Sequence, residues 1–73
     1  MTPYLPRGGP VLLFCFNQFE RNPCRRWYVH EIVDLVRWHG IKSSRKQIYN
    51  ALSYLTRKAF VARLQYGVYQ WRD

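Results

Sequence analysis

Residues 43–72 read SSRKQIYNALSYLTRKAFVARLQYGVYQWR, and two hydrophobic periodicities follow each other within this stretch. At 100° per residue, the first half places aliphatic side chains on one side of a helix and polar side chains on the other. The apolar side consists of Ile48, Ala51, Leu52, Leu55 and Ala59, and the polar side of Lys46, Asn50, Ser53 and Arg57. The pattern predicts a helix over 44–58 with one buried face and one exposed, cationic face.

The second half of the stretch alternates between apolar and polar residues, as a half-buried strand does. The expected apolar face consists of Phe60, Ala62, Leu64, Tyr69 and Trp71. A two-residue turn at Tyr66-Gly67 joins the two strands into a hairpin over 60–72. In that register Leu64 lies opposite Tyr69, and Ala62 opposite Trp71. Because tyrosine disfavours a positive φ, a turn one residue longer is the alternative.

Two further helices are predicted upstream. Pro10 suits the first position of a helix, and 11–21 carries apolar residues at helical spacing before Asn22-Pro23 ends it. A short extended segment over 24–28 precedes a second helix over 29–39, which Gly40 is placed to cap in a left-handed conformation. Only about four residues then separate this helix from the next, and a tight turn with glycine between two helices is typical of a helix-turn-helix.

The length and charge of the chain restrict its class. At 73 residues it fits one small domain, expected at 10–73 after a flexible N-terminal arm at 1–9 that is rich in proline and glycine. Twelve Lys and Arg against four Asp and Glu give a net charge of +8, and so basic a domain normally faces a polyanion, most often nucleic acid. No apolar run approaches the roughly 20 residues of a membrane span and no secretory signal is present, so we expect a cytoplasmic protein, or one in a host cytoplasm or nucleoid.

Catalysis, cofactors and bound metal are not expected. The only carboxylate side chains are Glu20, Glu31, Asp34 and Asp73, and the chain contains neither a glycine-rich phosphate loop nor a nucleophile motif. The thiols and imidazoles do not have the short paired spacings of structural zinc sites; they are Cys15, Cys24, His30 and His39. Without a secretory signal, the two cysteines are expected to be free thiols.

The run SRKQIYNALSYLTRKAFV at 44–61, with WYVHEI at 27–32, resembles the recognition helix and the entry to the second helix of winged helix-turn-helix domains. The predicted order of elements, three helices with a short extended segment before the second and a terminal hairpin, is also that of this family. The resemblance is best over 27–71 and implies a mainly α fold of three helices plus a C-terminal β-wing. The family usually has glycine where Ala59 stands, and alanine in the same left-handed backbone costs roughly 1 kcal/mol.

In this family, the positions that match Ser44, Arg45, Lys46, Tyr49 and Asn50 commonly face the major groove or nearby phosphates, so the resemblance implies these roles here. The helical pattern independently exposes Lys46 and Asn50. Asparagine can pair with adenine through two hydrogen bonds, and Arg45, Lys46 or Arg57 could take guanine or phosphate. Ser44 with Gln47 forms a capping-box pair, or Ser43 caps one residue earlier, and the backbone N–H groups left exposed attract phosphate.

We therefore expect a small transcriptional regulator or accessory factor that binds double-stranded DNA, of the kind that viruses and plasmids encode. The helix 44–58 would enter the major groove, and the wing 60–72 would lie on the backbone. The candidate DNA-binding residues are Lys42, Ser44, Arg45, Lys46, Tyr49, Asn50, Ser53, Arg57 and Arg63. Two alternatives stay open, a module whose basic face docks an acidic protein as an inhibitor or adaptor, and an RNA-binding protein. A homodimer is a further option, and Trp38 and Trp71 are expected in the core or at a subunit contact.

Overall fold

The computed structural model describes residues 9–72, so the expected N-terminal arm lies outside the described residues except for Gly9. The described part contains three helices and a three-stranded antiparallel sheet, and it is mixed α/β rather than mainly α. In chain order the elements are α1 (Pro10–Arg21), β1 (Arg26–Tyr28), α2 (Val29–Trp38), α3 (Arg45–Arg57), β2 (Val61–Gln65) and β3 (Val68–Trp71). None of the helices within 9–72 has the length and apolar character needed to cross a lipid bilayer.

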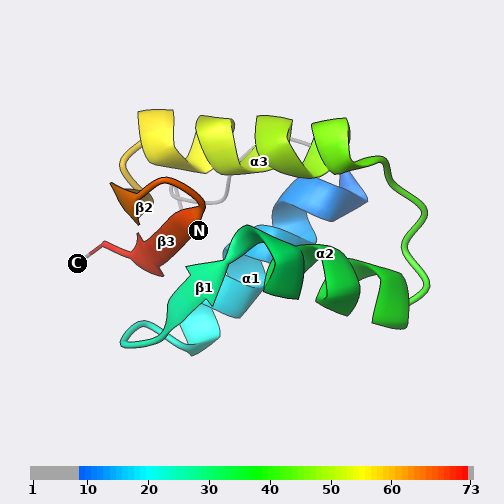
Figure 1. Ribbon diagram of the computed structural model, residues 1–73, viewed down its shortest axis with the longest axis horizontal. Coiled ribbons are helices and arrows are strands. Elements are labelled where there is room, and N and C mark those ends of the chain that lie inside the picture. The colour runs from blue at the N-terminus through cyan, green and yellow to red at the C-terminus, as the bar shows by residue number, and fades with distance from the viewer. Residues whose placement is uncertain (1–8, 73) are drawn as a thin grey trace, which may run out of the picture.

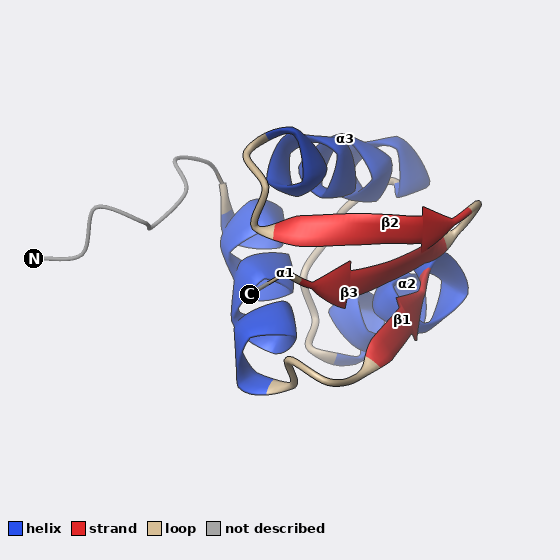
Figure 2. Ribbon diagram, turned by 90° about the vertical axis from the view of Figure 1, so that its left-hand side faces the viewer, coloured by secondary structure: helices blue, strands red, loops and turns tan. Residues whose placement is uncertain are grey.

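The helix α3 lies along one side of the molecule, and α1, α2 and β2 pack against its inner face (Figure 1). The strands lie beneath its C-terminal half, α2 lies beneath its N-terminal half, and α1 crosses behind both. The sheet has the strand order β1-β3-β2, and helices cover only one of its two faces (Figure 2). This arrangement leaves the outer face of α3 without a neighbouring element.

The hairpin forms where the alternating pattern predicts it, but the predicted register is wrong. Tyr69 lies opposite Arg63 and Trp71 lies opposite Val61, with an irregularity between Arg63 and Gln65. Consequently Val61 is 1% exposed and in the core, whereas Leu64, predicted to face inward, is 45% exposed. Of the two turn residues, only Gly67 has a positive φ, of 77°. Tyr66 therefore avoids the strain that a positive φ would cause at tyrosine.

The register differs because the exit from α3 includes Phe60. Its backbone N–H donates to the Leu55 carbonyl over 2.9 Å, and the Ala59 N–H donates to the Thr56 carbonyl over 3.0 Å. These two bonds form a Schellman motif, in which Ala59 takes the left-handed position with a φ of 64°. Phe60 therefore belongs to the helix cap, and the strand begins one residue later than its alternation alone suggests.

The end of α2 uses the same motif with the expected residues. Gly40 has a φ of 74°, its N–H donates to the Arg37 carbonyl over 2.9 Å, and the Ile41 N–H donates to the Val36 carbonyl over 3.2 Å. Ile41 also packs against the core, as the hydrophobic contact of this cap does. The prediction for Gly40 is confirmed, although residues 39–44 make the connection to α3 longer than the expected four.

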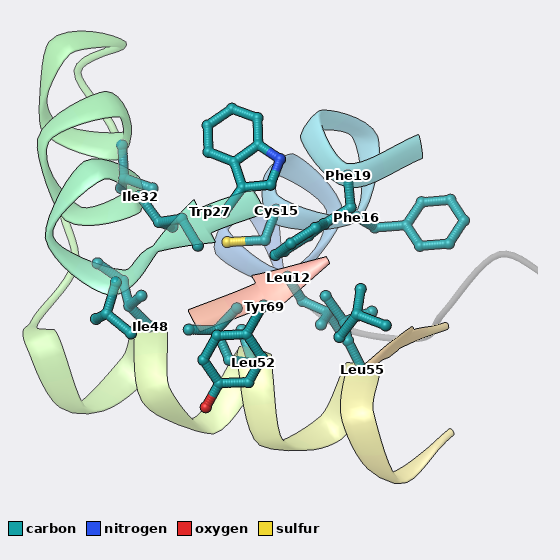
Figure 3. Close-up of a cluster of buried hydrophobic side chains, with 14 of the residues drawn as sticks. Leu12, Cys15, Phe16, Phe19, Trp27, Ile32, Ile48, Leu52, Leu55 and Tyr69 are labelled. Carbon is teal, nitrogen blue, oxygen red and sulfur yellow. The ribbon is translucent and has the colours of Figure 1, made fainter. Parts of the chain in front are cut away.

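All three helices and the sheet contribute to one apolar core (Figure 3). Phe16 packs edge-on against Phe60 and Trp71, with ring centroids 5.1 and 5.5 Å apart. Trp38, in contrast, is 85% exposed at the end of α2, which excludes a place in the core. The two thiols are free: Cys24 is exposed, and burial raises the pKa of Cys15 to about 12.

Candidate nucleic-acid interface

The outer face of α3 presents the polar residues that its periodicity predicts. Its inner face is buried through Ile48, Ala51, Leu52 and Leu55. The opposite side exposes a row that consists of Lys46, Asn50, Ser53 and Arg57. Arg45 and Tyr49 are also exposed and extend this row along the flank of α3, so six of the predicted side chains share one helix.

A capping box fixes the start of α3. The Gln47 N–H donates to the Ser44 Oγ over 3.2 Å, and the Ser44 N–H donates to the Gln47 Oε1 over 2.8 Å. Ser44 rather than Ser43 is therefore the N-cap, and its hydroxyl oxygen already accepts a bond within the helix. The first helical residues, Arg45 and Lys46, then place two exposed cations at the positive end of the helix dipole.

Charge is unevenly distributed along the chain. From residue 35 to residue 72 there is no Asp or Glu, whereas the cations of this segment are Arg37, Lys42, Arg45, Lys46, Arg57, Lys58, Arg63 and Arg72. The carboxylates of the described part belong to α1 and α2, and they are Glu20, Glu31 and Asp34. Since no carboxylate within 9–72 pairs with a cation of α3 or the hairpin, this side of the molecule has an uncompensated positive field.

The one ion pair within the described residues joins Arg25, just before β1, to Glu31 of α2. The Arg25 guanidinium lies 3.1 Å from the Glu31 carboxylate, and the other carboxylate oxygen accepts the Tyr28 N–H over 2.9 Å. The hydrogen bond from Tyr28, and less strongly the nearby Arg25, hold the pKa of Glu31 below its ordinary value. The guanidinium of Arg25 also lies 3.9 Å from the Trp27 ring centroid. This cluster stabilises the start of α2 and involves no cation of α3.

A pocket lies between the last turns of α3 and the hairpin. Its cavity volume is about 210 Å³, and it is lined by Ser53, Thr56, Arg57, Arg63 and Tyr69. Three of these residues, Ser53, Arg57 and Arg63, are candidate DNA-binding residues that the structure brings together from two elements. Thr56 and Tyr69 are additions that sequence reasoning missed. Tyr69 was missed because the predicted register placed Leu64 rather than Arg63 opposite it.

A second and more apolar groove lies on the other flank of α3. It has a cavity volume of about 350 Å³ between the start of α1, the residues after Gly40 and the first half of α3. Lys42 and Asn50 are among its polar lining residues, together with Gln47. Lys42 and Arg63 therefore lie on opposite flanks of α3 and do not belong to one cluster.

The tip of the hairpin is held against the rest of the sheet. The Val29 N–H at the start of α2 donates to the Gly67 carbonyl over 3.1 Å, and β1 pairs with β3 from Tyr28 to Arg26. Tyr66 at the tip is 86% exposed, with the Arg63 guanidinium 5.9 Å from its ring centroid. The hairpin thus offers an exposed aromatic ring and a cation at a fixed place rather than on a free arm.

Within residues 9–72, no three His, Cys, Asp or Glu side chains gather where they could hold a metal ion. Comparison of the chain with protein-family models, with curated proteins and with solved structures gave no match. The functional argument therefore rests on the geometry and charge of α3 and its surroundings.

Proposed function

We propose that this protein binds double-stranded DNA through the outer face of α3, as a small winged helix-turn-helix regulator or accessory factor. The observation that carries the proposal is the exposed row of Lys46, Asn50, Ser53 and Arg57 on a helix whose outer side no other element covers. A protein that needed these cations only for solubility would have no reason to omit every carboxylate from 35–72.

The arrangement of elements supports the same proposal. The sequence resembles winged helix-turn-helix domains over 27–71, and the order of helices, the short strand before α2 and the terminal hairpin agree with that resemblance. An α-helix fits the major groove, which is about 12 Å wide. An uncovered helix with a polar outer face therefore has the dimensions and the chemistry that groove entry requires.

Three side chains of the row have a chemical role in this proposal. The Asn50 amide can donate to and accept from an adenine edge, whereas Lys46 and Arg57 can donate to guanine or to phosphate oxygens. Arg45 near the start of α3 and Arg63 on β2 are suited to backbone phosphates, which position the helix without reading sequence. We therefore expect a few contacts to base edges, which distinguish sequences, and several contacts to phosphates, which make the affinity depend on salt concentration.

A fluorescence anisotropy titration of mixed duplexes at increasing salt concentration tests the proposal. Each phosphate contact contributes about one unit to the salt slope of the binding constant, so affinity should fall steeply with salt. The double variant Lys46→Glu/Asn50→Ala should lose at least about tenfold in affinity, since a bidentate base contact alone contributes ~1–3 kcal/mol. A duplex affinity that does not change with salt concentration, or that is the same in the double variant as in the wild type, would contradict the proposal.

Arg21→Glu is the matched control for charge. It changes the net charge by as much as Lys46→Glu does, and Arg21 ends α1. That end of α1 lies on the opposite side of the molecule from α3 (Figures 1 and 2). An equal loss of affinity in Arg21→Glu would show that only net charge matters. If nuclease treatment leaves an acidic protein bound to the wild type but not to Lys46→Glu, the docking alternative replaces DNA binding.

A further inference from the structure

The pocket between α3 and the hairpin has a lining that is suited to an anion. Arg57 comes from the last turn of α3 and Arg63 from β2, so two arginines from different elements line the same 210 Å³ cavity. The guanidinium of Arg63 also lies 5.9 Å from the centroid of the exposed Tyr66 ring. No carboxylate lines this cavity, and no carboxylate of the described residues pairs with either arginine. Two cations held on one pocket without a counter-charge repel each other, and an anion between them removes that repulsion.

Tyr69 adds a hydroxyl group to the lining of the pocket. Its side chain is 6% exposed, and its ring belongs to the apolar core. Figure 3 shows its hydroxyl oxygen directed away from the core cluster. No described residue forms a hydrogen bond with this hydroxyl. This hydroxyl is not one of the buried atoms without a partner, which in the described part are Trp27 Nε1 and Ser43 Oγ, and it can donate to a group in the pocket.

The other two hydroxyls of the lining differ from each other. The Thr56 Oγ1 donates to the Leu52 carbonyl over 2.8 Å, so its proton is already used within the helix. Ser53 is exposed and forms no such bond with the described residues. The pocket therefore offers hydrogen-bond donors from Arg57, Arg63, Ser53 and Tyr69, and Thr56 only shapes its wall.

We propose that this pocket binds a single phosphate group, held by the guanidinium groups of Arg57 and Arg63 and by the hydroxyls of Ser53 and Tyr69. Guanidinium groups bind phosphate oxygens in a bidentate manner that ammonium groups cannot reproduce. The C-terminal end of α3 opposes an anion with only about half an elementary charge, which two full positive charges outweigh. The cavity is larger than one phosphate and leaves room for water or for an adjoining sugar.

The position of the pocket agrees with the proposed contact to DNA. The assignment of the phosphate to a DNA duplex rests on that proposed function. Asn50 and Arg57 are seven residues apart, which corresponds to about 10 Å along a helix axis. The major groove is about 12 Å wide. With Asn50 at a base edge, Arg57 and the pocket are then near the groove wall, where the sugar-phosphate backbone runs. The same chemistry would accept a free phosphate, so the two sources need separate measurements.

Inorganic phosphate is the first probe. In an NMR titration of the full chain at constant ionic strength, phosphate should shift the backbone amides of 53–57, Arg63 and Tyr69, and chloride should not. Arg63→Gln should abolish these shifts, and Tyr69→Phe, which keeps the ring, should weaken phosphate binding several-fold. Arg21→Gln is the control and should bind phosphate as the wild type does. Absence of the shifts in the wild type, or wild-type binding by Arg63→Gln and Tyr69→Phe, overturns the proposal.

A DNA titration with the same variants separates the two sources. If a backbone phosphate occupies the pocket, Arg63→Gln should lower the salt slope of duplex binding by about one unit, and Tyr69→Phe should reduce affinity several-fold. Duplex binding that is unchanged in both variants rejects the pocket as a contact to DNA and leaves the proposed function intact. Phosphate binding without any duplex binding rejects the proposed function and assigns the pocket to a free phosphate.

Discussion

Ala59 holds a backbone conformation that alanine rarely adopts. Its φ of 64° lies in the left-handed region, where the Cβ atom approaches the following carbonyl oxygen and costs roughly 1–2 kcal/mol. The hydrogen bonds of the Schellman motif keep it there, because Phe60 must turn back to bond with Leu55. The sequence resemblance predicts a left-handed residue at this position, and Ala59 has that conformation.

Ala59→Gly should therefore stabilise the fold. Glycine removes the steric cost but adds about 0.4–1 kcal/mol of chain entropy in the unfolded state, so the net gain should be about 0.5–1 kcal/mol. Urea unfolding followed by circular dichroism measures this difference. Ala62→Gly is the matched control, since Ala62 lies in β2 opposite Gln70 and glycine should destabilise it there. A loss of stability in Ala59→Gly would show that the left-handed residue carries no strain.

At the scale of the elements, the sequence predicts the helices well because each has local signals. The apolar spacing of α3, its capping box and the glycine after α2 all act within a few residues of one another. The strand register has no such local signal. Alternation defines two faces but does not say which faces inward, and Val61 and Leu64 are both plausible inward residues by hydrophobicity. The helix exit at Ala59 decides between them.

The register also decides what the candidate site contains. With Leu64 opposite Tyr69, Arg63 would point to the other face of the hairpin, away from α3. In the observed pairing, Arg63 lies opposite Tyr69 and both line the pocket beside Arg57. The exposed row of α3 could be predicted from a single helix. The pocket could not be predicted, because it depends on a contact between segments that are distant in sequence.

The start of α2 should make stability depend on pH through Glu31. Its folded-state pKa lies below the ordinary value of 4.5, so ionised Glu31 stabilises the fold above that pH, and this contribution disappears as the pH falls through the folded pKa. Glu31→Gln keeps an acceptor for the Tyr28 N–H but does not titrate. The wild type should be the more stable protein at neutral pH, and the difference should vanish in acid.

Urea unfolding of both proteins between about pH 7 and pH 3 measures the difference. All other ionisable groups are the same in both proteins, so the comparison isolates Glu31. The prediction is wrong if the difference in unfolding free energy between wild type and variant stays constant over this range.

At the scale of the whole molecule, charge separates the two halves of the chain. The carboxylates of the described part lie on α1 and α2, whereas the segment from 35 to 72 contains only cations. Composition alone predicts a polyanion as the partner, but only the fold shows that Arg57 of α3 and Arg63 of the hairpin line one pocket. The like charges that attract a polyanion also repel one another in the free protein.

Salt should therefore have opposite effects on folding and on DNA binding. Raising NaCl from about 20 mM to about 500 mM shortens the Debye length from roughly 20 Å to below 5 Å, which screens repulsion among the cations of α3 and the hairpin. The midpoint of urea unfolding should rise over this range while duplex affinity falls. Arg63→Gln, which removes one cation from the pocket, should gain less stability from salt than the wild type, and Arg21→Gln should gain as much. If salt stabilises all three proteins equally, Arg63 does not contribute to the repulsion. Replacing Arg63 relieves only the cations close to it, such as Arg57, so an equal effect would contradict repulsion between these two residues.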